Sequence, residues 1–151
     1  MTSFPNPPRL AVVVSQFNPE VTGGLLAGTR HELNERGVPL LDTDIFSAPG
    51  AFEIPLLAQT LAKSGRYAGV ICLGCVIKGD TAHFEFISLG AATGLMQATL
   101  ATGVPITFGI LTTYTDEQAL IRSRNDAANK GREAAAACVE ALATLEKIKA
   151  A

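Results

Sequence analysis

The stretch "AGVICLGCVIKGDTAHFEF", residues 68–86, joins an unbroken apolar run to a short polar segment and then to a helix-like region. An apolar run without polar alternation is typical of a parallel strand that is buried on both faces. The polar segment contains a lysine, a glycine, an aspartate, a threonine and a histidine. We therefore predict a buried strand over residues 68–77, a loop rich in chemical groups, and a helix over residues 81–103.

The same alternation extends along the chain on both sides of this stretch. Further strand patterns cover residues 9–15, 43–48 and 104–112; helix patterns cover residues 17–37, 51–65 and 115 onward, with an interruption around 125–131. Alternation of this kind predicts a parallel sheet with right-handed crossovers and helices on both faces. We expect a three-layer α/β/α, flavodoxin-like fold with four parallel strands, forming a single domain over residues 1–151 with an extended arm at residues 1–8.

Residues at both ends of the first helix pattern fit known helix signals. Asn18 is a candidate N-cap, Pro19 suits the first helical position, and Gly37 suits the stop after the last turn. These residues predict the limits of the helix over residues 17–37.

The composition excludes several classes of protein. The 151 residues are 48% hydrophobic and 17% charged, with a net charge of −2. Without a basic excess, we expect no binding to nucleic acid or to an anionic membrane. No apolar run approaches the roughly 18 residues that span a bilayer, and the polar, proline-rich start is unlike a signal peptide. We expect a cytoplasmic protein, and the low charge predicts that other copies of the chain cover part of its surface.

The three cysteines are Cys72, Cys75 and Cys138. An odd number of cysteines in a cytoplasmic chain argues against a disulfide framework. Cys72 and Cys75 form a C-x-x-C pattern inside a strand, where residues three apart point to opposite faces. We therefore expect buried packing and no metal site.

The loops that follow the strands should share one edge of the sheet, where open α/β sheets bind ligands. Gly79, Asp80 and Thr81 precede a helix and fit an anion site, although a plain helix cap explains them equally well. His83 fits proton transfer near neutral pH; the alternative is an ordinary surface or packed histidine. The second histidine, His31, lies among charged residues and fits a solvated helix face.

Two further loops place aromatic and acidic groups at the same edge. Phe17 and Phe52 either hold a flat ring between them or close the core. Glu53, at a helix start, either accepts hydrogen bonds from hydroxyl groups or only favours the helix dipole. Arg122 and Lys130 lie on the last helical segment, where each alone would be an ordinary surface cation.

Taken together, the loops resemble one family, the lumazine synthases (6,7-dimethyl-8-ribityllumazine synthases) of riboflavin biosynthesis. The matching motifs, in order from about residue 10 to residue 149, are "SQFN", "PGAFEIP", "LGCVIKGDTAHFEFIS", "GVPITFGILTTYTDEQA" and "NKGREAA". The combination of "PGAFEIP" with "GDTAHFE" and "NKG" is specific to this family.

The resemblance implies a role for each matching position. Phe17 stacks on a pyrimidine ring, the segment Gly50, Ala51, Phe52 and Glu53 binds a ribityl chain, and Val76, Ile77 and Lys78 border the pyrimidine. Gly79, Asp80, Thr81 and Arg122 bind a phosphate, and His83 transfers protons. Phe108, Lys130 and the helix that carries Arg122 belong to the neighbouring subunit's side of the site.

The resemblance also implies the reaction and the partners. An amine of 5-amino-6-(D-ribitylamino)uracil attacks the ketone of 3,4-dihydroxy-2-butanone 4-phosphate, a Schiff base forms, phosphate leaves and the ring closes with loss of water. Because the substrate supplies the nucleophile, we expect no cofactor and no metal. We expect a homo-oligomer, a pentamer or a multiple of it, with the active site between subunits, and a functional link to riboflavin synthase.

Two positions depart from the family pattern. Gln16 stands where many members have arginine, and "SRNDAA", residues 123–128, lacks the glycines that many shell-forming members have there. The second departure weighs against a larger shell.

Two other functions compete with this interpretation. One is a flavodoxin-like carrier of a flavin or nucleotide, which a purified sample that is yellow with tightly bound flavin, yet inactive, would favour. A shell-building protein with a decayed site is the third hypothesis, against which His83, Glu53 and Arg122 argue.

Overall fold

The computed structural model describes residue 4 and residues 6–151. The four strands are β1 (Leu10–Ser15), β2 (Ile45–Ala48), β3 (Gly69–Ile77) and β4 (Ile106–Thr113). The five α-helices are α1 (Pro19–Glu35), α2 (Ile54–Lys63), α3 (His83–Thr102), α4 (Asp116–Arg122) and α5 (Lys130–Ala150). Two short 3-10 helices, η1 (Asp42–Asp44) and η2 (Ala51–Glu53), flank β2. Part of the expected arm, residues 1–3 and 5, lies outside the described residues.

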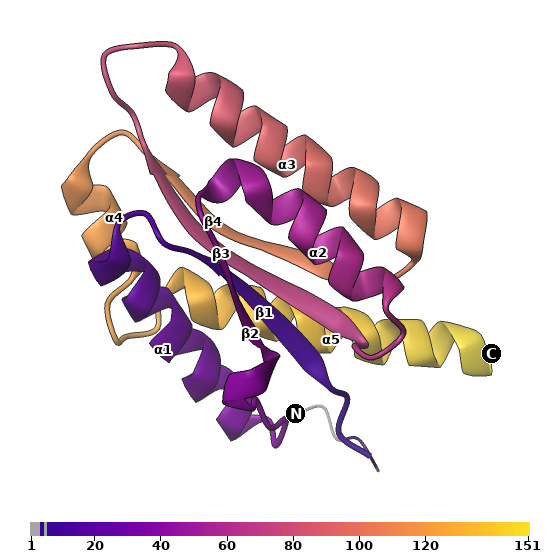
Figure 1. Ribbon diagram of the computed structural model, residues 1–151. Coiled ribbons are helices and arrows are strands. Elements are labelled where there is room, and N and C mark those ends of the chain that lie inside the picture. Colours follow the sequence, from indigo (N-terminus) through magenta and orange to yellow (C-terminus); the bar gives the residue numbers. More distant parts are fainter. Residues whose placement is uncertain (1–3, 5) are drawn as a thin grey trace.

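The strands form one parallel sheet in the order β2-β1-β3-β4. Helices α2 and α3 cover one face of the sheet, and α1, α4 and α5 cover the other (Figure 1). The predicted three-layer α/β/α architecture with four parallel strands is therefore confirmed. Of the helices in the described part of the chain, none is long and apolar enough to cross a membrane.

Side chains from alternate strand positions build two apolar layers. Val13 and Cys72 pack with α2 and α3 on one face, whereas Val12 and Cys75 belong to the layer beneath α1 and α5. Cys138, on α5, joins the second layer. All three cysteines are buried and free, and the C-x-x-C pair points to opposite faces as expected.

The limits of α1 agree only in part with the sequence prediction. Pro19 begins the helix, and Gly37 follows its end with a φ of 70°, as expected of a glycine stop. Asn18 occupies the N-cap position but does not cap with its side chain. Its backbone is left-handed, with a φ of 55°, and its Nδ2 donates to the Cys75 carbonyl at 3.4 Å. The expected capping role of this side chain was therefore wrong, because the amide reaches across to β3 instead.

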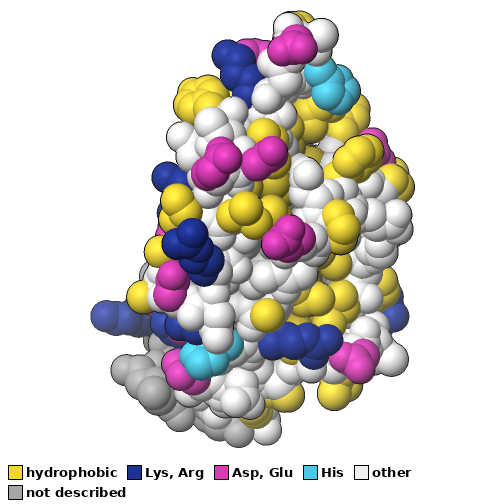
Figure 2. Space-filling view, turned by 90° about the vertical axis from the view of Figure 1, so that its left-hand side faces the viewer, with side chains coloured by type: hydrophobic (Ala, Val, Ile, Leu, Met, Phe, Trp, Pro, Cys, Tyr) yellow, Lys and Arg dark blue, Asp and Glu magenta, His cyan; other side chains and the backbone are white. Residues whose placement is uncertain are grey.

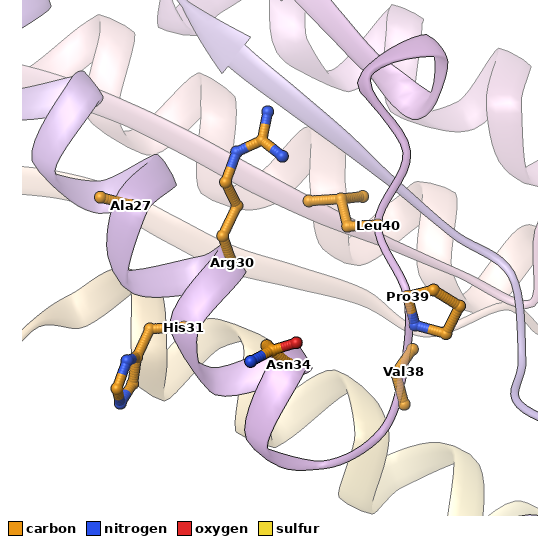
Figure 3. A pocket seen from close by; sticks show the side chains of 7 residues that line it. All are labelled: Ala27, Arg30, His31, Asn34, Val38, Pro39 and Leu40. Atoms are coloured by element: carbon orange, nitrogen blue, oxygen red, sulfur yellow. The ribbon is translucent and has the colours of Figure 1, made fainter.

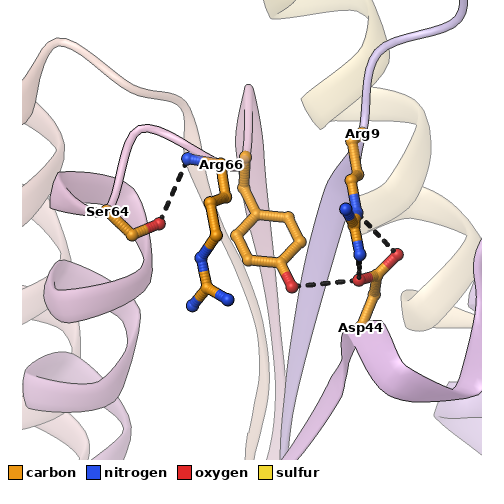
Figure 4. A network of polar contacts seen from close by, with 5 residues as sticks. Arg9, Asp44, Ser64 and Arg66 are labelled. Atoms are coloured by element: carbon orange, nitrogen blue, oxygen red, sulfur yellow. Dashed lines mark hydrogen bonds and ion pairs between the residues drawn. The ribbon is translucent and has the colours of Figure 1, made fainter.

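A buried carboxylate ties the start of β1 to the start of β2 (Figure 4). Asp44 is 1% exposed; its carboxylate accepts hydrogen bonds from Arg9 at 2.8 Å and from the Tyr67 hydroxyl at 2.9 Å. Arg9 and Arg66 also lie 5.4 and 5.5 Å from the centre of the Tyr67 ring. The hydrogen bonds from Arg9 hold the pKa of Asp44 below its usual value, although burial opposes them.

We expect Asp44→Ala to lower the free energy of unfolding by about 1–3 kcal/mol at neutral pH, because the buried Tyr67 hydroxyl loses its acceptor. A carboxyl whose pKa is lower in the folded state stabilises the fold above its unfolded pKa and loses that effect as the pH falls. Urea unfolding should therefore separate variant from wild type most at about pH 7, and the difference should shrink as the pH falls below the usual Asp pKa of about 3.9. Asp42→Ala is the control, since Asp42 is exposed and forms a surface ion pair with Arg30; an equal effect of both variants would contradict the prediction.

Candidate active site

The carboxyl ends of the strands form one edge of the molecule, next to the starts of α1, α3 and α4 (Figure 1). Figure 2 faces this side and shows hydrophobic side chains exposed among acidic and basic ones. A groove of about 570 Å³ opens there, and we call it the histidine groove. The predicted residues that line it are Phe17, Gly50, Ala51, Phe52, Glu53, Val76, Ile77 and His83. Three strand-end loops and the first turn of α3 thus converge on one hollow.

Gly50 lies between the aromatic and acidic side chains of the groove. A Cβ added to Gly50 would meet Glu53 Oε1 at 3.2 Å and Phe17 Cδ2 at 3.5 Å. Phe17 and Glu53 are both exposed, so neither is occupied by the core. The groove therefore offers a ring face and a carboxylate close together, an arrangement that suits a flat ring bearing a chain of hydroxyl groups.

Phe52 does not close the core either, because it is 56% exposed. Its ring lies against Gly90 of α3, where a Cβ would come within 2.7 Å of Phe52 Cε1. The absence of a side chain at Gly90 thus lets the ring approach the helix closely. Of the two alternatives for Phe17 and Phe52, the one in which they close the core was wrong.

His83 is the first residue of α3 and is exposed at the rim of the histidine groove. Its backbone N–H donates to Thr81 Oγ1 at 3.3 Å, so the Thr81 hydroxyl does serve the helix start. The N-cap position itself belongs to Ala82, which cannot cap. Of the two residues predicted as caps, Thr81 therefore lies one residue and Asp80 two residues before the N-cap position.

The loop over residues 78–81 lies beside the histidine groove, outside its lining. The Lys78 backbone N–H donates to the Thr113 carbonyl at 2.9 Å, which continues the pairing of β3 with β4. The Lys78 ammonium lies 3.7 Å from Glu85 and 5.7 Å from the Tyr114 ring. The side chains of Asp80 and Thr81 are exposed, and a Cβ at Gly79 would meet open space. The loop thus leaves room above its backbone.

The remaining predicted residues form a second hollow along β4, which is an edge strand of the sheet. It has a volume of about 280 Å³ and is lined by Phe108, Arg122, Lys130, Glu133 and β4 itself. We call it the arginine groove. Arg122 Nη1 donates to the Gln118 carbonyl at 3.1 Å, and Lys130 Nζ lies 2.8 Å from Glu133 Oε2. Two cations and an aromatic ring therefore gather there, and among the described residues none lines both grooves.

Sequence reasoning missed four residues that line the histidine groove, namely Asn18, Cys75, Ile87 and Asp116. Burial and the nearby Asp116 carboxylate raise the pKa of the Cys75 thiol to about 11. Asp116 begins α4 directly after β4, so the rule that strand-end loops share one edge already pointed to it. Nothing local marked Ile87 or Cys75, which reach the groove only through the packing of α3 and β3.

A third hollow, of about 420 Å³, lies between the end of α1 and the segment that leads to β2 (Figure 3). Arg30 and His31 border it from α1. Arg30 pairs with Asp42 at 2.8 Å and His31 with Glu35 at 3.0 Å, so both are held within the chain. His31 lies on a solvated face as predicted, and this hollow contains none of the predicted site residues.

The sequence matches a family model and several named proteins along most of its length. The family model described as 6,7-dimethyl-8-ribityllumazine synthase matches residues 7–146. The chain is 66% identical over 145 residues to a 6,7-dimethyl-8-ribityllumazine synthase 1 of Caulobacter vibrioides, covering 96% of this chain and 95% of the relative. Proteins with the name 6,7-dimethyl-8-ribityllumazine synthase from Salinibacter ruber and Deinococcus deserti are 45% and 43% identical, each covering 93% of this chain and 90% of the relative.

Proposed function

The chain belongs to the 6,7-dimethyl-8-ribityllumazine synthase family, and we propose that its two grooves are complementary halves of the active site. The enzyme condenses 5-amino-6-(D-ribitylamino)uracil with 3,4-dihydroxy-2-butanone 4-phosphate. It forms 6,7-dimethyl-8-ribityllumazine and releases phosphate and water, in the penultimate step of riboflavin biosynthesis.

One observation carries the proposal: most of the site residues divide between two separate hollows, and residues 78–81 lie beside the first of them. The histidine groove holds the ring-binding and hydroxyl-binding groups, and the arginine groove holds two cations. A reaction that joins a pyrimidine to a phosphorylated ketone needs both sets within a few ångströms of each other. We propose that the arginine groove of one chain faces the histidine groove of its neighbour, which brings both sets together.

The pyrimidine substrate belongs in the histidine groove. Phe17 stacks on its ring, while Val76, Ile77 and Lys78 border the ring at the end of β3. The ribityl chain lies along residues 50–53, where Glu53 accepts hydrogen bonds from its hydroxyl groups. The exposed position of Phe17 and the nearness of both Phe17 and Glu53 to Gly50 support this placement.

The butanone phosphate lies between the two chains. Its phosphate is bound by Arg122 of the neighbour, because a guanidinium forms directional, charge-assisted hydrogen bonds with phosphate oxygens. The backbone over residues 79–81 binds it from the other side, and Lys130 and Phe108 of the neighbour complete the pocket. The open space above Gly79 supports this placement.

The chain contributes binding, orientation and proton transfer. The 5-amino group of the pyrimidine attacks the ketone carbon, and loss of water from the adduct gives the imine. Loss of the C3 proton as the C4–O bond to phosphate breaks gives an enol, which tautomerises to a carbonyl at C3. The ribitylamino nitrogen attacks this new carbonyl, and ring closure releases a second water. His83, at the rim between the two substrates, moves protons in these steps, while positioning supplies the larger part of the rate.

Exposed apolar side chains support a homo-oligomer. Phe86, Leu89, Met96 and Leu100 are 60–77% exposed, and their spacing of three, seven and four residues places them along one side of α3. Exposed apolar surface of this extent usually marks an interface. We propose a homopentamer, since rings close head-to-tail contacts, and we propose a cytoplasmic location with a functional link to riboflavin synthase.

The direct test mixes the purified protein with both substrates and follows the fluorescence of the lumazine product. Fluorescence should grow only when both substrates are present, with one phosphate released per product. Phosphate release without lumazine, or a tightly bound flavin with no turnover, would contradict the proposal.

His83→Ala should lower kcat about ten-fold or more and change the KM values little, because a proton-transfer group acts in the reaction steps and less in binding. Rates should be compared between pH 6 and 8. His31→Ala is a matched control, since His31 is the other histidine and pairs with Glu35 on a solvated face. A His83 variant with the wild-type rate across this range would remove His83 from the mechanism.

A further inference from the structure

Asn129 is a buried polar residue at the junction of α4 and α5, and it is 1% exposed. Its Oδ1 accepts from the backbone N–H groups of Gly131 at 2.8 Å and Arg132 at 3.1 Å, which caps α5. Its Nδ2 donates to the carbonyls of Arg124 at 2.8 Å and Gly24 at 3.1 Å. One carboxamide therefore fastens three segments: the start of α5, the 123–128 segment and the middle of α1.

Helix α1 has glycines where it packs against this junction. A Cβ at Gly28 would overlap the Asn129 carboxamide, and one at Gly24 would overlap the Ser123 carbonyl. From the other side, a Cβ at Gly131 would overlap the Leu25 carbonyl. These three glycines thus allow α1 to pack closely against the junction of α4 and α5.

The 123–128 segment needs no glycine of its own, because none of its residues has a positive φ. Asp126 Oδ1 accepts from the Ala128 N–H at 2.9 Å, and Asn125 Oδ1 accepts from Arg132 at 2.8 Å. Residues 124–128 are exposed. The Asn129 amide group therefore links two backbone carbonyls, that of Arg124 in the segment and that of Gly24 in α1.

The two cations of the arginine groove stand at the two ends of this segment. Arg122 is the last residue of α4, and Lys130 is the first residue of α5. Both line the groove, although seven residues lie between them in the chain. The separation of guanidinium and ammonium thus depends on the path of the segment that Asn129 holds.

We propose that Asn129 is a positioning residue that holds Arg122 and Lys130 in register for the phosphate of the butanone substrate. This inference rests on the proposed function of the arginine groove. Asn129 itself touches no substrate. It acts by joining the cap of α5 to the Arg124 carbonyl, two residues after Arg122.

Asn129→Ser separates the two functions of the carboxamide. A serine oxygen still caps α5, but it does not reach the carbonyls of Arg124 and Gly24. We expect the KM for butanone phosphate and the inhibition constant of inorganic phosphate to rise about ten-fold, with the KM for the pyrimidine within about two-fold of wild type. Arg124→Ala, in the same segment and exposed, keeps the backbone carbonyl that Asn129 contacts and should change neither KM. Asn129→Ala, which also loses the cap, should fold less well.

A double-variant comparison separates positioning from general stability. In an Arg122→Ala background, Asn129→Ser should have almost no further effect on the KM for butanone phosphate, because the group it positions is gone. Wild-type values in Asn129→Ser, equal rises in both KM values, or additive effects in the double variant would each overturn the inference. If Arg122→Ala alone leaves phosphate inhibition unchanged, the proposed phosphate site is wrong instead.

Discussion

Replacing Arg122 by alanine should lower kcat/KM for butanone phosphate by about 100-fold or more, because the phosphate loses charge-assisted hydrogen bonds that form both in binding and during its departure. Arg122 lines the arginine groove, and its Nη1 donates to the Gln118 carbonyl of the same helix at 3.1 Å. The KM for the pyrimidine should change little, since that substrate lies in the other groove. Steady-state rates with each substrate varied in turn give both values.

Inorganic phosphate supplies a second measurement of the same site. It should compete with butanone phosphate in the wild type and much less in Arg122→Ala. Arg122→Lys should be intermediate, because an ammonium keeps the charge without the two-pronged geometry. Arg124→Ala is the matched control, since Arg124 is exposed and lies outside the arginine groove. Equal inhibition of wild type and Arg122→Ala would place the anion site elsewhere.

The layer architecture was predictable because the two central strands, β1 and β3, are apolar on both faces. Residues 69–77 have this pattern, and β3 forms there within one residue of the predicted start. The same rule placed the loops after β1, β2 and β3 at one edge, and the residues of these loops do meet in the histidine groove. Parallel strands share a direction, so this convergence follows from topology and needs no knowledge of individual contacts.

Contacts between distant segments were not predictable, because no local pattern marks them. Asn18 has the residue type of a helix cap, yet its side chain donates to Cys75, 57 residues away. The four hydrogen bonds of Asn129 and the buried carboxylate of Asp44 depend likewise on how whole elements pack. Propensity describes a residue and its neighbours, whereas these side chains are satisfied by partners that only the fold brings near.

The separation of the site residues into two grooves was implied by resemblance alone. Arg122 lies on α4, which begins after the carboxyl end of β4, whereas Phe108 lies near the amino end of β4. Strand order alone would have placed Arg122 in the same hollow as His83. In the structure, Phe108 and Arg122 line the hollow along the edge strand β4 and not the histidine groove. The proposal that two chains share one site can therefore be tested by mixing chains.

Mixed rings of two impaired variants should regain activity. If His83 and Arg122 of one site come from neighbouring chains, random mixing of His83→Ala and Arg122→Ala in equal amounts gives an intact pair in about one quarter of the sites. With about one tenth of wild-type activity left in His83→Ala sites and almost none in Arg122→Ala sites, the mixed sample should be about five-fold more active than the mean of the two variants reassembled separately. It should be about three-fold more active than His83→Ala alone. The variants are dissociated together, reassembled and assayed beside each variant reassembled alone.

The converse mixture tests the same geometry in the opposite direction. In this mixture, a chain that carries both substitutions is combined with wild type in equal amounts. If neighbouring chains share the site, about one quarter of the sites have both His83 and Arg122 intact. If both residues act within one chain, about one half of the sites have them intact. Mixing should therefore lower the activity of this pair, while it raises that of the single variants. A single-chain site predicts no change in either mixture, so two mixtures that stay constant after verified subunit exchange would disprove the shared site. The opposite signs also separate shared catalysis from a general effect of reassembly, which would move both mixtures in the same direction.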